Sequence, residues 1–113
     1  MSAWKEITSF EEWQEIYDKT SDRGAVLLKH STTCPVSASA LEEYEEYLAN
    51  NPNQNVDYYL IKVIESRPIS LQIAEDVKVK HASPQIIYIK NKSSEWNTSH
   101  WSVTAKHIRA VLD

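Results

Sequence analysis

The sequence contains very little cysteine or glycine and no long hydrophobic stretch. Its 113 residues include one cysteine, Cys34, and one glycine, Gly24. A single cysteine allows no disulfide within the chain, whereas small secreted domains usually carry several. The apolar runs reach only four residues, far short of the about 20 that cross a bilayer. We therefore expect a cytoplasmic protein without a membrane-spanning segment.

Basic residues are also few and scattered. Lysine and arginine total 12 against 16 acids, so the net charge is −4. No basic stripe of the kind that binds a phosphate backbone is present, and we expect no nucleic-acid partner. The first six residues include an acid, Glu6, and lead into no apolar segment, which is not the pattern of a secretory signal. The composition is typical of a globular protein, and the length predicts one domain over residues 1–113.

Hydrophobic periodicity predicts strands and helices that alternate along the chain. The first helix begins with the capping box of Ser9 and Glu12. The next strand is apolar on both faces, which is typical of a central strand. The predicted strands cover residues 4–7, 25–30, 56–63, 85–90 and 96–101, and the predicted helices cover residues 9–18, 35–49, 68–77 and 104–112.

The order of these elements is βαβαβαββα. Strand–helix–strand units imply parallel pairs with right-handed crossovers, and the final hairpin adds an antiparallel edge. This is the thioredoxin topology, an α/β fold with a central mixed sheet and helices on both faces. We expect the apolar stripe of the helix over 35–49 to face the sheet and its glutamates to form a solvated face: Glu42, Glu43, Glu45 and Glu46.

Cys34 follows the buried strand over 25–30 and a polar turn, and it opens a helix. Pro35 suits the first helical position because its missing N–H costs no hydrogen bond there. Free N–H groups at a helix N-terminus stabilise an anion, so we expect the pKa of the Cys34 thiol to lie below the free value of about 8.5. The thiolate is the species that attacks a disulfide. The alternative is a small buried hydrophobic residue, but the position at the start of a helix favours a nucleophile.

Ser37 stands three residues after Cys34 and gives the motif C-P-V-S. A dithiol oxidoreductase has a second cysteine at this position. Serine cannot resolve a mixed disulfide, so an external thiol must release Cys34. Ser37 either donates a hydrogen bond to the thiolate or is a neutral residue of the first turn, and the sequence leaves both open.

Pro84 directly precedes the strand over 85–90. In this topology such a proline lies beside the active cysteine, and we expect the Ser83–Pro84 bond to be cis. The backbone of Ser83 would then face Cys34 and pair with an extended substrate. A trans proline at the start of an edge strand is the alternative.

The histidines and tryptophans give weaker indications of function than Cys34 and Pro84 do. The four histidines do not have zinc-type spacing, so we expect no metal site. His30 either tunes the thiol or is an ordinary residue at a strand end. We expect Trp96 and Trp101 to cover the sheet.

The segments T-C-P-V-S at 33–37 and H-A-S-P-Q at 81–85 resemble those of the monothiol bacilliredoxins, thioredoxin-like proteins linked to bacillithiol. The similarity covers nearly the whole chain. The resemblance implies that Cys34 is the nucleophile and that Thr33, Ser83 and Pro84 contact substrate. It further implies removal of bacillithiol, or a similar small thiol, from S-thiolated client proteins by a monomer or weak dimer. Bacillithiol would be a co-substrate and not a tightly bound cofactor.

Other functions stay open. A monothiol glutaredoxin-like iron–sulfur carrier also uses one cysteine, but usually in C-G-F-S, where this chain has Pro35 and Val36. A non-catalytic interaction module with a thioredoxin fold is the other alternative. A peroxiredoxin is disfavoured because Ser31 stands where that class needs threonine.

Overall fold

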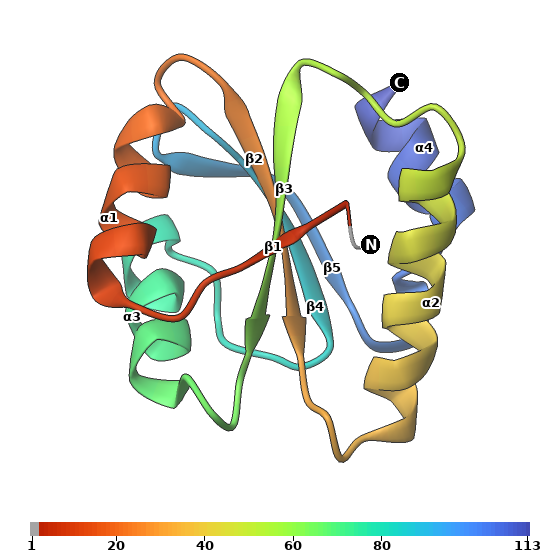
Figure 1. Cartoon of the computed structure of the whole chain (residues 1–113), viewed down its shortest axis with the longest axis horizontal. Coiled ribbons are helices and arrows are strands. Elements are labelled where there is room, and N and C mark those ends of the chain that lie inside the picture. The colour runs from red at the N-terminus through yellow and green to blue at the C-terminus, as the bar shows by residue number, and fades with distance from the viewer. Residues whose placement is uncertain (1–2) are drawn as a thin grey trace.

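The centre of the chain is a mixed sheet of five strands packed between helices on both faces (Figure 1). The computed structural model describes residues 3–113. The strands lie in the order β1-β3-β2-β4-β5, and the predicted α/β class is confirmed. The elements in chain order are β1 (Lys5–Glu6), α1 (Phe10–Lys19), β2 (Gly24–His30), α2 (Pro35–Ala49), β3 (Val56–Lys62), α3 (Arg67–Val77), β4 (Gln85–Lys90), β5 (Ser93–Ser99), the 3₁₀-helix η1 (His100–Ser102) and α4 (Ala105–Leu112).

The start of α1 follows from its local sequence. Ser9 is the N-cap, and its hydroxyl oxygen accepts the backbone N–H of Glu12 at 3.1 Å. The other half of the predicted capping box differs, because the Glu12 carboxylate accepts the backbone N–H of Thr8 at 2.9 Å and not that of Ser9. The carboxylate thereby ties the residue before the cap to the first helical turn.

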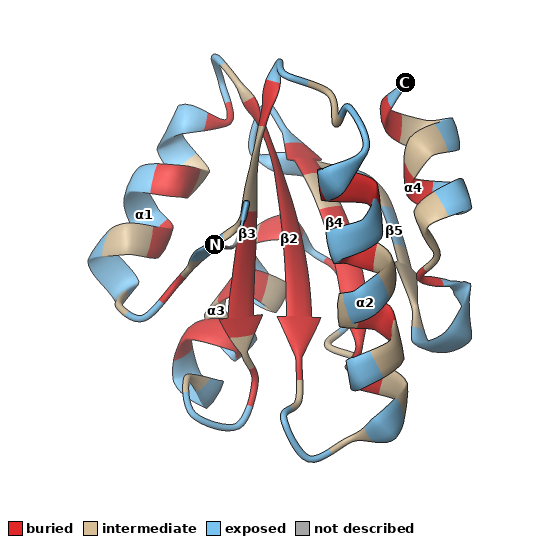
Figure 2. Ribbon diagram, turned by 45° about the vertical axis from the view of Figure 1, so that its right-hand side comes forward, coloured by how far each residue is buried: buried red, intermediate tan, exposed pale blue. Residues whose placement is uncertain are grey.

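β2 forms the middle of the sheet, and all seven of its residues are buried (Figure 2). Its side chains alternate between two hydrophobic clusters. Leu27 belongs to the cluster beneath α1 and α3, and Leu28 to the cluster beneath α2 and α4. A strand covered on both faces reads as a continuous apolar run, which is the pattern that predicted it.

One strand direction differs from the expectation. β3 runs parallel to β1 and β2, but β4 pairs with β2 in the antiparallel direction. The expectation of a parallel pair after α3 was therefore wrong. Residues 78–84 lead the chain from α3 back to the edge where β2 and β3 end, the lower edge in Figure 1, so β4 starts at that edge.

The final hairpin is tighter than the sequence predicted. Asn91 and Lys92 both have positive φ, 53° and 61°, and form the turn by themselves. β5 consequently starts at residue 93 and ends at residue 99. Trp101 lies beyond the strand in η1, so the prediction of a strand over 96–101 was wrong at both ends.

α4 packs beside α2 on one face of the sheet (Figure 1). Thr104 is the N-cap of α4 and accepts the backbone N–H of His107 at 3.2 Å. Glu43 of α2 is half-buried and accepts the backbone N–H of Ala105 at 2.8 Å. The prediction that all four glutamates of α2 are simply solvated was therefore wrong for Glu43, which caps the neighbouring helix.

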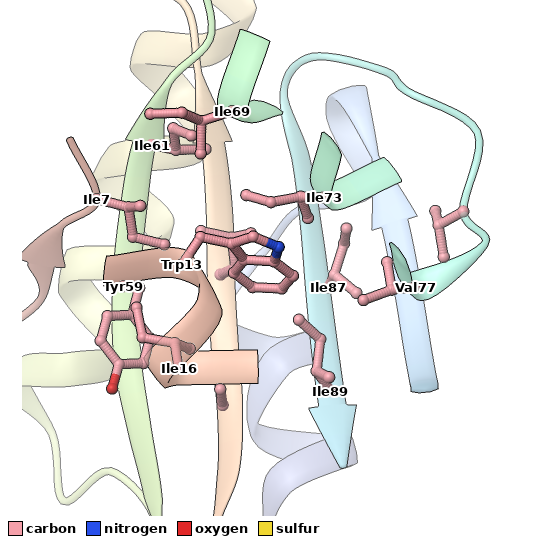
Figure 3. Packing of buried hydrophobic residues seen from close by; sticks show 13 residues of the cluster. Ile7, Trp13, Ile16, Tyr59, Ile61, Ile69, Ile73, Val77, Ile87 and Ile89 are labelled. Carbon is pink, nitrogen blue, oxygen red and sulfur yellow. The ribbon is translucent and has the colours of Figure 1, made fainter. Parts of the chain in front are cut away.

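The opposite face is covered by α1 and α3, with Trp13 at the centre of the hydrophobic cluster (Figure 3). The indole N–H of Trp13 donates to Asp76 Oδ2 at 2.8 Å and so joins the two helices. Within residues 3–113, no helix is long and apolar enough to cross a membrane.

Candidate active site

Several chain segments meet at one edge of the sheet, the lower edge in Figure 1. β2 and β3 end there because they are parallel. β4 begins there and β5 ends there because the pairs β2–β4 and β4–β5 are antiparallel. α2 starts at the same edge, directly after the turn that follows β2. Residues widely separated in sequence are thereby brought together around the start of α2.

Cys34 is the N-cap residue of α2, and its side chain is half-buried. Its extended backbone ends the turn over 31–34, in which the Cys34 N–H donates to the Ser31 carbonyl at 3.3 Å. The Cys34 carbonyl accepts the first helical bond, from Ala38 N–H at 3.1 Å. Pro35 occupies the first helical position, as the sequence predicted.

The helix start lowers the pKa of the Cys34 thiol below its usual value. The largest contribution is the backbone N–H of Ser37, and burial opposes it. The backbone N–H of Val36 and the Ser37 hydroxyl lower the pKa further. All three donor groups lie in the first turn of α2, which is the region that stabilises a negative charge. The direction of the predicted shift is confirmed.

Ser37 is fully buried, and its hydroxyl has a defined role in the turn. Its Oγ accepts the backbone N–H of Ser31 at 3.2 Å. Since the oxygen is the acceptor in that bond, the hydroxyl proton is free to point elsewhere. This arrangement favours the donor role for Ser37, because the Cys34 thiolate gains from a proton pointed at it.

The Ser83–Pro84 bond is cis, as the sequence predicted. The pairing of Lys29 with Gln85 in the antiparallel β2–β4 ladder places Pro84 beside the end of β2. Pro84 is buried and Ser83 half-buried. Within the described residues, 3–113, Ser83 Oγ is a buried oxygen without a hydrogen-bond partner. Thr33, the remaining predicted substrate contact, is exposed, and its Oγ1 lies 3.3 Å from Ser31 Oγ.

The turn after β5 also belongs to this edge, and sequence reasoning missed it. The backbone N–H of His100 donates to the Pro84 carbonyl at 2.9 Å. His100 has a left-handed backbone with φ of 56°, and the next residue, Trp101, is 69% exposed. Trp96 is half-buried against His107, with ring centroids 5.0 Å apart. The prediction that both tryptophans cover the sheet was therefore wrong for Trp101, because β5 ends before it.

A second missed feature is Lys29, which is fully buried in β2. Its Nζ lies 3.0 Å from Nδ1 of His81, which stands three residues before Pro84. The signal that could have revealed it is a lysine inside the predicted buried strand over 25–30. A buried ammonium needs hydrogen-bond partners, and these come from elsewhere in the fold.

His30 ends β2 on the side that faces α2, and it is buried. Its pKa is lowered, mainly by burial, while the backbone of Ser37 acts in the opposite direction. Its Nδ1 has no hydrogen-bond partner within residues 3–113. In the same part of the chain, no three side chains of histidine, cysteine or acid type gather as metal ligands.

A mixed sheet with a thiolate-favouring cysteine at the start of α2, and with a cis-proline loop at the same edge, defines a thioredoxin-like thiol oxidoreductase. Residues 5–108 match the family model of the monothiol bacilliredoxin BrxC, and the chain belongs to the monothiol bacilliredoxin family. The resemblance to this family is thus confirmed over nearly the whole chain.

Solved structures agree with this class. A proposed oxidoreductase with a thioredoxin fold superposes with a TM-score of 0.84 at 27% identity, over 98% of this chain and 95% of the other. Thioredoxin of Malassezia sympodialis superposes with a TM-score of 0.76 at 18% identity, over 99% of this chain and 90% of the other. Thioredoxin of Fasciola hepatica superposes with a TM-score of 0.74 at 11% identity, over 96% of this chain and 95% of the other. The latter two show a common fold.

Proposed function

We propose that this thiol oxidoreductase removes bacillithiol, or a similar small thiol, from mixed disulfides on client proteins. The observation that carries the proposal is a single thiol at the start of α2 with Ser37 in place of a second cysteine. A site with one thiol can accept a small thiol from a disulfide, but it cannot form an internal disulfide. The family match supports the choice of bacillithiol.

The exchange has two balanced steps. The Cys34 thiolate attacks the small-thiol sulfur of the mixed disulfide, and a new S–S bond forms as the old one breaks. The client cysteine leaves as a thiolate and takes a proton from solvent. A second small thiol, as its thiolate, then attacks the disulfide on Cys34. It releases Cys34 as a thiolate and leaves as a symmetrical disulfide, so each client cysteine that is reduced consumes one incoming small thiol, which is oxidised to the disulfide.

The other segments at this edge support binding of an extended client segment. Ser83 lies just before β4, whose first residue pairs with Lys29 near the end of β2, and its backbone would face a substrate bound there. Main-chain groups of Ser83 beside the strand ends would form hydrogen bonds with an extended peptide and so align a disulfide held by that peptide. Thr33 is exposed on the turn before Cys34 and would contact the same substrate.

The test uses a single-cysteine peptide in mixed disulfide with bacillithiol. The wild-type protein should release the reduced peptide and gain the mass of bacillithiol on Cys34. Cys34→Ser should do neither, because no thiol remains. Ser37→Cys should release the small thiol from Cys34 without an added thiol, since residues 34 and 37 lie one helical turn apart.

Control peptides carry glutathione or cysteine in place of bacillithiol and show which small thiol is preferred. Release of reduced peptide by Cys34→Ser would disprove the assignment of the nucleophile. An iron–sulfur carrier would purify coloured and lose its colour in Cys34→Ser. An interaction module would leave every peptide oxidised.

A further inference from the structure

Lys29 is a buried cation at the end of the central strand. It is 0% exposed and lies on the face of β2 that carries α1 and α3, two residues after Leu27. Removing an ammonium group from water costs several kcal/mol unless other groups solvate it. Because Lys29 lies close to the active edge, the groups that solvate its ammonium could affect the active site.

Two acceptors hold the ammonium group. Lys29 Nζ donates to the backbone carbonyl of Ser70, in the first part of α3, at 3.1 Å. The same nitrogen lies 3.0 Å from His81 Nδ1. These partners are 41 and 52 residues away in sequence, so Lys29 joins β2, α3 and the segment between α3 and β4.

The contact with Lys29 determines the protonation state of His81. An ammonium group has only protons to offer, so Nδ1 of His81 must accept. The imidazole is therefore neutral and carries its proton on Nε2. Burial, followed by the charges of Lys29 and Arg67, lowers the pKa of His81, which agrees with the neutral form.

His81 lies on the segment that presents the cis-proline. Residues 78–84 connect α3 to β4 and end in Ser83 and Pro84. A second bond closes this segment, from Gln85 Nε2 to the Lys80 carbonyl at 3.0 Å. Gln85 is also the residue that pairs with Lys29 across the β2–β4 ladder. Lys29 and Gln85 thus hold the segment at two adjacent residues, His81 through its imidazole and Lys80 through its carbonyl.

We propose that Lys29 is a positioning residue for thiol–disulfide exchange: through His81 it holds the segment 78–84 so that Ser83 and Pro84 stand beside the end of β2 and the start of α2. The proposal rests on exchange at Cys34 and not on the identity of the small thiol. Lys29 touches neither substrate nor sulfur in this role. Its effect is on the alignment of the bound disulfide, and alignment within about 1 Å is decisive for such a step.

The arrangement makes the position of the segment sensitive to acid. When His81 is protonated, both ring nitrogens become donors and the Lys29 contact becomes a repulsion between cations. The cations that bear on His81 are Lys29 from β2 and Arg67 from α3. Lys80 precedes it in the chain, while Ser70 and Gln85 are neutral. Exchange should therefore fall below the pKa of His81, in addition to the loss of Cys34 thiolate.

The experiment compares two reactions of the same thiol. Iodoacetamide alkylation reports the Cys34 thiolate alone. Exchange with a single-cysteine peptide in mixed disulfide with cysteine reports the thiolate together with the alignment of the substrate. In Lys29→Met and His81→Leu, exchange should fall about tenfold, the value of one hydrogen bond to a charged group, while alkylation stays within about twofold.

Two further variants separate positioning from a structural role. His81→Asn keeps an acceptor near the place of Nδ1 but cannot be protonated, so it should restore exchange and abolish the extra loss in acid. Lys80→Met removes an exposed lysine from the same segment and should behave as wild type. If Lys29→Met fails to fold, the His81→Leu and His81→Asn pair carries the test.

The outcomes distinguish this inference from the proposed function. If wild-type protein exchanges but the ratio of exchange to alkylation is unchanged in Lys29→Met and His81→Leu, the positioning role is wrong. A His81→Asn variant that keeps the acid loss of wild type would also overturn it. Absence of exchange in the wild-type protein with this peptide and with the bacillithiol and glutathione peptides would instead reject thiol–disulfide exchange itself.

Discussion

The chemistry of Cys34 depends on one neighbouring residue as well as on the helix. Ser37 lowers the pKa of the thiol through its backbone N–H and through its hydroxyl. The hydroxyl oxygen is held in place by the N–H of Ser31 at 3.2 Å. The serine in the last position of C-P-V-S therefore supports the thiolate, although it cannot resolve a disulfide.

Ser37→Ala should raise the pKa of Cys34, because the hydroxyl contribution is lost while the backbone contribution stays. The rate of iodoacetamide alkylation against pH measures this, and its midpoint should move to higher pH. Ser39→Ala, on the same helix, is the control and should leave the midpoint in place. An unchanged midpoint in Ser37→Ala would show that the backbone alone sets the pKa.

Lys29 illustrates a residue that lowers stability. Burial lowers its pKa from 10.5 to about 8 in the folded protein. Between these two pH values the unfolded chain binds more protons than the folded one, so the contribution of Lys29 to stability rises with pH there. Below about pH 8 the full destabilisation is present.

Lys29→Met should therefore increase the free energy of unfolding at pH 7, by at most about 3 kcal/mol, since each pKa unit corresponds to about 1.4 kcal/mol. The gain should shrink as the pH rises from 8 towards 10.5. Urea unfolding of both proteins across this range measures the difference. A gain that is the same at pH 7 and pH 10 would contradict the pKa of about 8. A more stable but less active variant is the expected sign of a residue retained for function.

At the scale of elements, the turn η1 completes the active edge. Its backbone is bound to Pro84 through the His100 N–H at 2.9 Å, and it packs against α2. Trp101 follows His100 on this turn, and its indole is 69% exposed. Large aromatic side chains of this kind stabilise bound peptides through contact area.

Trp101→Ala should weaken binding of a peptide mixed disulfide and leave stability unchanged. We expect KM to rise about threefold to tenfold, the usual effect of one aromatic contact, with kcat almost constant. Phe10→Ala is a matched control, because Phe10 is also exposed but lies on α1, on the other face of the sheet. Equal KM values for wild type and Trp101→Ala would remove Trp101 from the substrate surface.

At the scale of the whole molecule, the sheet separates two hydrophobic clusters, the first of which is drawn in Figure 3. One is covered by α1 and α3, and the other by α2 and α4. Cys34 begins α2, so its helix rests on the second cluster. Trp13 and its bond to Asp76 hold the first cluster together, on the opposite face.

Trp13→Phe should destabilise the protein by about 1–3 kcal/mol, because the Asp76 carboxylate loses a buried donor and the core loses volume. Cys34 alkylation in the folded protein should be unchanged, since α2 rests on the other cluster. Thermal unfolding and the alkylation rate together test this separation. A slower alkylation rate in the folded variant would show that the two faces are coupled.

Local sequence determined the elements and the place of the nucleophile. Hydrophobic periodicity and capping residues predict the helices, and the apolar residues 25–28 predict a buried strand. A polar turn followed by Pro35 places Cys34 at the start of a helix. These features depend on neighbours a few residues apart, so they can be read without the fold. The cis Ser83–Pro84 bond was predicted as well, but only through the expected topology.

The remaining features depend on contacts between segments that are distant in the sequence. The direction of β4 depends on how residues 78–84 return to the active edge, and the contacts of Lys29 join residues 41 and 52 positions apart. The bond from His100 to Pro84 requires β5 to end two residues before Trp101. Such contacts arise where separate segments meet in space. Periodicity records which face of a strand or helix is buried, but not which polar partners that face meets.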